Sequence, residues 1–354
     1  MSKFNGKNVS IEIYGESHSQ KIGVKVKGYP SFKFDSQKLQ NFLARRKAGC
    51  DIFSTSRIEP DTPVFSGVDD GNINGEFSAD IYNVNKKSSD YNNLIGKPRP
   101  SHADYVTFIK DGVTDFSGGG RFSGRLTAPL CIAGGIALQY LESKGVYISA
   151  YVSSVGNVNA KSYKTEVFSN EELIKLRDDG VFPSLDSKQE IINEISTVKS
   201  GGDSVGGTVE CVIYNLNAGV GDSLFEGLEG KIASLVYAIP AVKGVEFGSG
   251  FDLTKMNGSI ANDSFYYDEN GDVKTSSNHA GGINGGISNG NLITLRVAFR
   301  PTPSIAKKQK TIDVINKKNV EIQIGGRHDS CIVPRAVPCV ESAVAIAILD
   351  EILN

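Results

Sequence analysis

Apolar positions recur along the chain with two periods, which predict a mixture of helices and strands. A spacing of three to four residues predicts amphipathic helices, and apolar residues at every second position predict half-buried strands. The helices expected are 35–49, 129–144, 228–239 and 338–352, with polar-faced helices at 169–178 and 184–198. The strands expected are a pair within 9–30 and single strands at 63–66, 80–84, 146–155, 209–213 and 293–299.

These elements follow one another without a regular alternation of strand and helix. Antiparallel sheets with one covered face are therefore favoured over a parallel sheet with crossover helices. The polar stretch 86–105 contains two prolines and predicts a long surface or active-site loop. No linker, internal repeat or low-complexity stretch divides the 354 residues, so we expect a single domain over 1–354.

Composition and charge exclude several classes of protein. Hydrophobic residues make up 39% of the chain and charged residues 22%, as in ordinary globular proteins. The net charge of −2 gives no broad basic surface for nucleic acid or for an anionic membrane. No apolar run reaches the length of a membrane span, and the first residues lack the apolar core of a signal peptide. Five scattered cysteines without a CxxC pair fit a reducing cytoplasm rather than a disulfide framework.

Acid–base chemistry is indicated by the histidines, all of which stand in polar segments and none on an apolar helical face. They are His18, His102, His279 and His328. Histidine moves protons near neutral pH, although a single histidine in such a setting is more often structural. No pair has the i, i+4 spacing of a helical zinc motif, so we expect no metal site.

A pocket for a polyanion is indicated by arginines in loops and at the ends of elements. They are Arg45, Arg46, Arg57, Arg99, Arg121, Arg125, Arg300, Arg327 and Arg335. Guanidinium groups bind carboxylates and phosphates through paired hydrogen bonds, and solvated surface charge is the alternative for any one of them. The glycine-rich segment 118–125 opens a helix, where free N–H groups bind anions, but it matches neither the dinucleotide fingerprint nor a Walker loop.

Seven short motifs resemble those of the chorismate synthases, in that family's order and spacing over nearly the whole chain. They are Gly15-Glu16-Ser17-His18, Arg99-Pro100-Ser101-His102-Ala103-Asp104-Tyr105, Gly118-Gly119-Gly120-Arg121-Phe122-Ser123-Gly124-Arg125, Gly202-Asp203-Ser204-Val205-Gly206-Gly207, Val242-Lys243-Gly244-Val245-Glu246, Ser277-Asn278-His279-Ala280-Gly281-Gly282 and Gly326-Arg327-His328-Asp329. Each motif alone is modest, but seven in order are highly specific.

The resemblance implies an α+β fold, with one large domain built as a β-α-β sandwich whose helices lie between two antiparallel sheets, and a homotetramer. The implied activity is that of a carbon–oxygen lyase: the anti 1,4-elimination of phosphate from 5-enolpyruvylshikimate 3-phosphate, which gives chorismate in the last step of the shikimate pathway to aromatic amino acids. The implied cofactor is reduced FMN without net redox change, with NADP(H) only as an indirect flavin reductant. Two carboxylates and a phosphate on this substrate would explain the arginines.

The resemblance also assigns roles to the residues that match the motifs. His102 would protonate the departing phosphate, His18 would set the protonation of reduced flavin, and Asp329 would assist proton removal. The clamp for substrate or flavin anions would consist of Arg46, Arg125 and Arg327, with Ile52 in the region linked to anion or NADP contacts. The FMN site would comprise Arg121, Phe122, Ser123, Pro240, Ala241, Gly285, Arg300, Pro301, Thr302, Pro303, Ser304 and Arg327.

Several positions depart from the family's usual residues, and two other functions stay open. Ile52 stands where many members have an arginine, so an NADP contact is not carried over to it. The other departures are Lys47-Ala48 for Arg-Pro, Phe122 for serine, Pro240 for asparagine, Arg300 for lysine, and Ser19 and Ser101 for glycine. A flavin-dependent oxidoreductase would show a lasting change of the flavin spectrum during turnover. A non-catalytic sensor of a phosphorylated ligand is disfavoured by the two polar histidines and Arg327-His328-Asp329.

Overall fold

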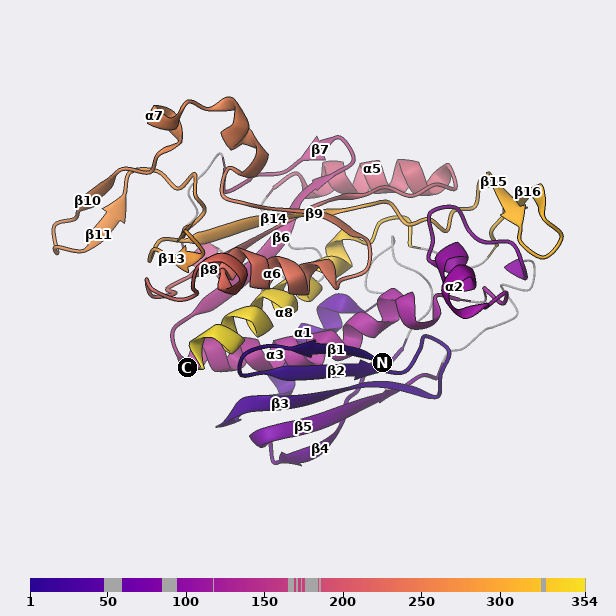
Figure 1. The fold of residues 1–354 in the computed structure, drawn as a ribbon, viewed down its shortest axis with the longest axis horizontal. Helices are drawn as coiled ribbons and strands as arrows, with labels where there is room; N and C mark the ends of the chain where they lie inside the picture. The colour runs from indigo at the N-terminus through magenta and orange to yellow at the C-terminus, as the bar shows by residue number, and fades with distance from the viewer. Residues whose placement is uncertain are drawn as a thin grey trace.

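Two antiparallel sheets of five strands each enclose a layer of helices (Figure 1). The computed structural model describes residues 1–47, 59–84, 94–116, 118–164, 169, 171–172, 174–175, 184, 186–325 and 329–353. The sheets lie on opposite sides of the helical layer, and one hydrophobic core joins all three layers. The expected α+β sandwich is therefore confirmed.

The first sheet is built from the N-terminal part of the chain. Its strands, in spatial order, are β1 (Ser2–Asn5), β2 (Ser10–Tyr14), β3 (Lys21–Lys33), β5 (Asn72–Tyr82) and β4 (Val64–Asp69). Alternation decides which face is covered: Ile22, Val24 and Val26 on β3 are buried against the helices, whereas Lys25 is exposed. The strand pair expected within 9–30 is confirmed, and the piece expected at 80–84 is the end of the longer β5.

The second sheet is covered on both faces over its central strands. Its order is β7 (Val158–Asn159), β6 (Tyr147–Val155), β8 (Gly207–Tyr214), β14 (Ile293–Phe299) and β9 (Val242–Phe247). The expectation of one covered face is wrong for β8, where residues 209–214 are all buried. Its outward-facing Val212 and Tyr214 pack with Tyr151 and Tyr163, which shields this side from water.

Four helices fill the space between the sheets: α1 (Ser36–Arg46), α3 (Thr127–Ser143), α6 (Leu228–Tyr237) and α8 (Val333–Ile352). Helix α3 is buried all round from Thr127 to Leu138, because it lies between other elements on every side. Its Gly134 rests on Ser342 of α8, where an added Cβ would lie 2.1 Å from the serine Cβ. The two central helices therefore touch almost backbone to backbone.

The start expected for the last helix, near Pro338, is wrong. Helix α8 begins five residues earlier, at Val333, and Pro338 lies inside it. Proline removes one backbone hydrogen bond from a helix, and the sequence pattern treats it as a boundary. Burial of nearly the whole helix outweighs that loss here. The polar-faced helix expected at 184–198 is α5 (Lys188–Ser200), and the one expected at 169–178 lies largely outside the described residues.

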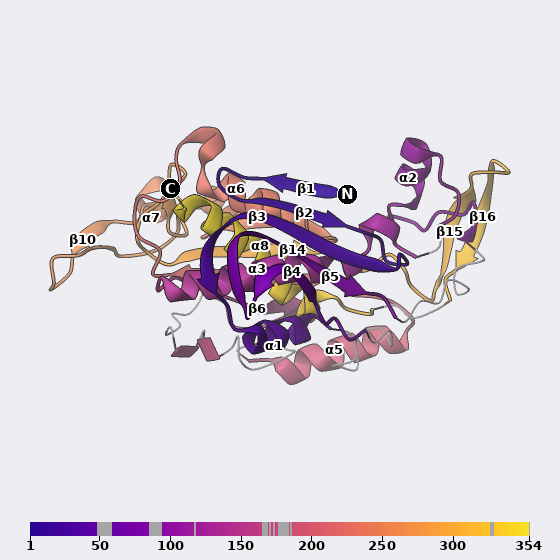
Figure 2. The same cartoon turned by 90° about the horizontal axis from the view of Figure 1, so that it is seen from below.

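Smaller elements extend from the sandwich at the two ends of its long axis (Figures 1 and 2). One end carries α2 (Asp104–Asp111) and the paired strands β15 (Lys308–Asp313) and β16 (Lys318–Gln323). The other end carries α7 (Gly258–Ala261), the arm of β10 (Phe265–Tyr267) and β11 (Val273–Thr275), and the hairpin of β12 (Ile283–Asn284) and β13 (Ile287–Ser288). Short 3₁₀ turns are η2 (Gly120–Phe122), η3 (Gly124–Leu126), η4 (Leu224–Glu226) and η5 (Gly250–Lys255). Within the described chain, none of the helices combines the length and the apolar character that a membrane span needs.

Candidate active site

The turn that carries His18 lies against the glycine-rich segment before α3. The backbone N–H of Ser17 donates a hydrogen bond to the Gly120 carbonyl at 3.2 Å. Gly118 has a φ of +70° and faces the imidazole of His18, so that an added Cβ would lie 3.0 Å from its Cε1 atom. Glycine at 118 therefore meets two demands at once, a left-handed backbone and close contact with a histidine ring.

His102 belongs to a tight loop whose side chains bond to one another. Its Nδ1 atom lies 2.5 Å from Oδ1 of Asp104, the first residue of α2. Arg99 bonds the same carboxylate through Nε at 2.7 Å and Nη2 at 2.8 Å. Burial alone would raise the pKa of Asp104, but the hydrogen bonds from Arg99 and His102 lower it to about 2. The carboxylate is therefore ionised at any physiological pH, next to a histidine that is 18% exposed.

The connection from β14 to β15 joins several of the expected cofactor residues to this loop. Arg300 donates from Nη1 to the Ser101 carbonyl at 2.6 Å, and its backbone N–H donates to the Ala241 carbonyl at 3.0 Å. Ser304 accepts a hydrogen bond from Nη1 of Arg99 at 3.3 Å. The polypeptide around 240–241 and 300–304 is thereby fixed to the segment that holds His102.

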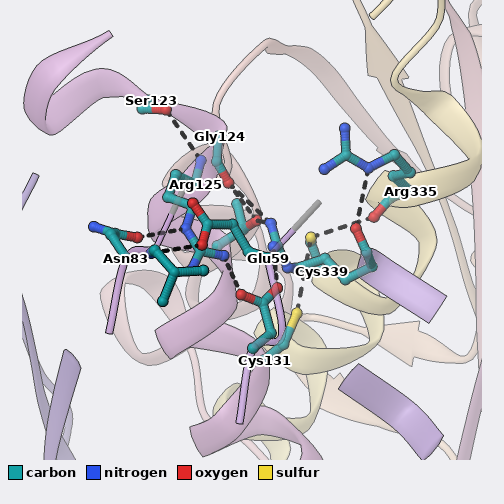
Figure 3. A network of polar contacts seen from close by, with 12 residues as sticks. Glu59, Asn83, Ser123, Gly124, Arg125, Cys131, Arg335 and Cys339 are labelled. Atoms are coloured by element: carbon teal, nitrogen blue, oxygen red, sulfur yellow. Dashed lines mark hydrogen bonds and ion pairs between the residues drawn. The ribbon is translucent and has the colours of Figure 1, made fainter. Parts of the chain in front are cut away.

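Arg46 and Arg125 share one buried carboxylate, that of Asp61 (Figure 3 shows Arg125 and its surroundings). Arg46 reaches Asp61 Oδ2 through Nη2 at 2.7 Å, and Arg125 bonds the other oxygen. Burial alone would raise the pKa of Asp61, but the two guanidinium groups outweigh it and lower the pKa. Both arginines keep a nitrogen without a hydrogen-bond partner among the described residues, Nε of Arg46 and Nη2 of Arg125. Buried donors are usually satisfied by protein, by ordered water or by a ligand, so these two nitrogens are candidate donors to a bound anion.

Asn83 joins this cluster to the turn of His18. Its side-chain oxygen accepts from Nε of Arg125 at 3.0 Å, and its Nδ2 donates to the Ser19 carbonyl at 2.9 Å. The neighbouring acid Glu59 is also buried and accepts a hydrogen bond from the backbone of Val84 at 2.9 Å. The arginine cluster and the turn of His18 are thus parts of one bonded framework.

Asp329 connects to the arginine cluster through Arg335 at the start of α8. Nη1 of Arg335 lies 2.8 and 2.7 Å from the two carboxylate oxygens, and its Nε donates to the Arg46 carbonyl at 3.0 Å. The Asp329 carbonyl accepts from the Thr302 hydroxyl at 2.8 Å. Asp329 therefore lies between the arginine cluster and the 300–304 connection.

Two buried thiols, one from each central helix, lie next to each other (Figure 3), and both are close enough to Arg46 for its charge to act on them. Cys131 of α3 donates a hydrogen bond to Cys339 of α8 across 3.8 Å. Burial raises the pKa of Cys131, whereas the hydrogen bond from Cys131 and the nearby Arg46 lower the pKa of Cys339.

Among the remaining expected residues, Ser123 belongs to the arginine cluster, because its hydroxyl accepts a hydrogen bond from the backbone N–H of Arg125 at 3.2 Å (Figure 3). The side chains of Arg121 and Phe122 are partly exposed, the Arg121 guanidinium lies over the Phe122 ring, and Arg121 pairs with Asp111 of α2. Gly285 lies in the β12–β13 hairpin, at the opposite end of the long axis from α2 (Figure 1). The positions of Ile52 and Arg327 are outside the described residues. Within the described part of the chain, no three His, Cys, Asp or Glu side chains are grouped so that they could hold a metal ion.

Sequence reasoning overlooked three polar residues of this framework: Asp61, Asn83 and Glu59. They lie in a turn-rich stretch and at the end of a strand, and no motif marks them. Only their unusual environment identifies them, because Asp61 and Glu59 are acidic side chains that are 1% and 6% exposed. Buried acids of this kind are almost always paired. Because the partners of Asp61 and Glu59 come from other segments, the local sequence gives no signal.

Comparison with known proteins gives one consistent result. A model of the chorismate synthase family matches residues 9–353. A chorismate synthase from Thermococcus kodakarensis is 42% identical, covering 99% of this chain and 97% of that protein, and one from Christiangramia forsetii is 43% identical with the same coverage. A crystal structure of chorismate synthase superimposes with a TM-score of 0.75 at 25% identity, covering 99% of this chain and 93% of the other. The sandwich, the histidine loop and these matches lead to one conclusion: the chain belongs to the chorismate synthase family.

Proposed function

We propose that this chain converts 5-enolpyruvylshikimate 3-phosphate to chorismate and phosphate by anti 1,4-elimination, as a lyase of aromatic amino acid biosynthesis. The observation that carries the proposal is the histidine loop, in which His102 is hydrogen-bonded to an ionised Asp104. This loop is connected to the buried arginines in two steps. Arg99 bonds the carbonyl of Gly118, which lies against His18, and Asn83 joins the turn of His18 to Arg125. A proton donor and anion-binding groups within one framework suit a reaction that expels phosphate from an anionic substrate.

The arginine cluster is proposed to bind anionic groups of substrate or cofactor. Among the described residues, the charges of Arg46, Arg125 and Arg335 are matched by those of Asp61, Glu59 and Asp329, so these side chains alone offer the ligand no net positive charge. The orphaned nitrogens supply directed donors instead, because an oxyanion that reached Arg125 Nη2 or Arg46 Nε would satisfy them. Gly124 has open space where a Cβ would stand, which leaves room for such an approach.

The residues present fit reduced FMN as the cofactor. A flavin phosphate needs directed N–H donors, which the arginine cluster provides, and the connection 300–304 is fixed beside the histidine loop. When bound, reduced FMN would supply the electron density that helps phosphate leave. We assign His18 to the flavin's protonation, His102 to protonation of the leaving phosphate, and Asp329 to acceptance of the substrate proton. NADP(H) is proposed to act only as an indirect reductant of flavin.

The decisive experiment is an anaerobic assay with 5-enolpyruvylshikimate 3-phosphate and chemically reduced FMN. We expect chorismate and phosphate in equal amounts, with reduced flavin recovered at the end. Stoichiometric oxidation of the flavin would instead indicate a flavin-dependent oxidoreductase. Binding of the substrate without release of phosphate would indicate a sensor of a phosphorylated ligand.

The protein is proposed to act in the cytoplasm as a homotetramer. Free buried cysteines at 131, 211, 331 and 339 are compatible with a reducing compartment. Exposed aromatic residues on the β10–β11 arm, Phe265 and Tyr267, support association between copies. Light scattering coupled to size-exclusion chromatography measures the assembly directly, and a monomer would contradict this proposal.

A further inference from the structure

The carboxylate of Asp104 accepts four hydrogen bonds, and three of them come from Arg99. Oδ2 accepts from the backbone N–H of Arg99 at 2.9 Å and from its Nε at 2.7 Å, and Oδ1 accepts from its Nη2 at 2.8 Å. The fourth partner is Nδ1 of His102, at 2.5 Å from Oδ1. The side chains of Arg99 and Asp104 are only 3% and 5% exposed, so water competes little for these groups.

The hydrogens on Arg99 Nη2 are taken by other acceptors, so the hydrogen between His102 and Asp104 has to come from the histidine. Nη2 carries two hydrogens, and its shortest contacts are the Gly118 carbonyl at 2.6 Å and Asp104 Oδ1 at 2.8 Å. Neither hydrogen is left for His102 Nδ1, which lies 3.1 Å away. A ring nitrogen 2.5 Å from a carboxylate oxygen needs a hydrogen between the two atoms, and Asp104 is ionised. The hydrogen is therefore on Nδ1, and it is donated to Asp104.

We propose that Arg99 and Asp104 are positioning residues that hold His102 as its Nδ1–H tautomer, so that Nε2 is the ring atom that gains and releases a proton. Arg99 orients the carboxylate, and the carboxylate orients the imidazole, as the third group does in other hydrogen-bonded catalytic sets. The use of Nε2 in turnover rests on the proposed function of His102. The tautomer itself does not.

The same guanidinium also fixes the surroundings of the ring. Nη1 of Arg99 donates to Ser304 at 3.3 Å, and Nη2 donates to the carbonyl of Gly118, the residue that touches the ring of His18. One buried side chain thus joins the His102 loop, the connection after β14 and the glycine-rich segment. Nε2 is thereby held in a defined position relative to both neighbouring segments.

The test replaces Asp104 by asparagine and reads the tautomer of His102 directly. The full-length protein is labelled with ¹⁵N-histidine, and the imidazole signals are assigned by their loss in His102→Gln. We expect the wild-type ring to be protonated at Nδ1 above its titration range. In Asp104→Asn the side-chain amide places an N–H opposite His102 Nδ1, which donates a hydrogen bond in the wild type. The Nδ1–H form should therefore give way to the Nε2–H form, in which Nδ1 accepts.

Two further variants separate positioning from simple stabilisation of the loop. Asp313→Asn is the matched control, because Asp313 is also buried, accepts backbone hydrogen bonds from Ile315 and Asn316 and lies beside Gly96 of the same loop. It should leave the tautomer unchanged. Arg99→Lys keeps the Asp104 carboxylate, so the ring of His102 should retain the Nδ1–H form in this variant. This expectation can be tested even if Asp104→Asn fails to fold.

The outcomes distinguish this inference from the proposed function. An Nε2–H ring in the wild type, or an Nδ1–H ring that persists in Asp104→Asn, overturns the inference. If the tautomer changes as expected, kcat of Asp104→Asn in the phosphate-release assay should fall about 10²–10⁴-fold with little change in KM. A changed tautomer with normal kcat would leave the positioning intact and contradict the acid role of His102.

Discussion

At the scale of single residues, Asp61 balances two buried guanidinium groups at once. Its side chain is 2% exposed, and those of Arg46 and Arg125 are 5% and 6% exposed. Removing one partner of a buried ion pair leaves uncompensated charge in a medium that solvates it poorly. The stability of the site therefore depends on an acid that no motif contains.

We expect Asp61→Asn to lower the free energy of unfolding by about 3–5 kcal/mol, because two guanidinium groups lose their counter-charge. Denaturant unfolding measures the change. The control is Asp70→Asn, which removes a carboxylate that pairs with Lys33 and is 85% exposed. That control should leave the free energy of unfolding nearly unchanged, because water already solvates both partners of the pair. Equal effects of the two substitutions would show that Asp61 does not balance the arginines.

His102→Ala tests the acid role at the same scale. Turnover should fall about 10²–10⁴-fold while reduced FMN still binds, because a general acid lowers the barrier without holding the cofactor. Turnover, flavin affinity and melting temperature are measured on one preparation. His279→Ala is the matched control, since His279 bonds Ser249 away from the histidine loop. Near-normal turnover would contradict the acid role, and a loss of flavin binding equal to the loss of rate would indicate a structural one.

The ionisation of Asp104 predicts a pH-dependent contribution to stability. Its pKa is about 2 in the folded protein against 3.8 as the ordinary value. A depressed carboxyl pKa stabilises the fold above the unfolded value, and that stability is lost as the pH falls toward the folded value. We expect a contribution of about 2 kcal/mol at neutral pH, of which about half is lost by pH 3. Unfolding at pH 5 and pH 3 should show a smaller loss in Asp104→Asn than in the wild type, and parallel losses would contradict the assignment.

At the scale of elements, the contact between α3 and α8 decides the geometry of the site. Gly134 and Ser342 let the two helices meet backbone to backbone. Cys131 and Cys339 lie next to this crossing, and Arg335 on α8 holds both Asp329 and the carbonyl of Arg46. Any separation of these helices therefore moves the arginine cluster relative to Asp329.

Gly134→Ala should destabilise the protein by about 1–3 kcal/mol, because its new methyl group would overlap Ser342 in a packed core. Gly230→Ala in α6 is the matched control, since nothing lies within 4 Å of the Cβ position there. In that helix alanine should stabilise by up to about 1 kcal/mol through its higher helix propensity. Denaturant unfolding of both variants measures the difference. A stabilising Gly134→Ala would show that the helices can separate without cost.

At the scale of the whole molecule, segments distant in sequence form one ligand-binding framework. Arg99 bonds to Ser304 and to Gly118, and Asn83 joins Arg125 to the turn of His18. We expect a ligand that further restrains one of these segments to restrain the others as well, because they are hydrogen-bonded to one another. The second ligand would then lose less conformational entropy on binding, which would couple the two binding events.

Reduced FMN should therefore bind more tightly in the presence of 5-enolpyruvylshikimate 3-phosphate, and the substrate more tightly in the presence of reduced FMN. Allosteric coupling of about 1–3 kcal/mol corresponds to a change in affinity of about 5–150-fold, equal in both directions. Anaerobic titration of each ligand with and without the other measures both factors. Equal flavin affinity with and without substrate would contradict the coupling.

Patterns within the sequence are enough to predict most elements and the family. Periodic apolar positions predict α1 and α6, because an amphipathic helix buries one face at its own repeat whatever lies opposite. The seven motifs indicate the chorismate synthases, and the family matches confirm that resemblance. The roles of individual site residues remain predictions, since the motifs name them without locating their partners.

Which charges meet and which faces are covered depends on how distant segments pack together. Asp61 and Arg125 are 64 positions apart, and Arg46 and Arg335 are 289 positions apart. The alternation of residues along a strand does not reveal whether a second layer covers its outer face. The sequence therefore predicts a half-exposed β8, whereas residues 209–214 are all buried. Pro338 marks a local break that burial of α8 overrides. These features depend on packing between distant segments, whereas sequence periodicity records only the repeat of each element on its own.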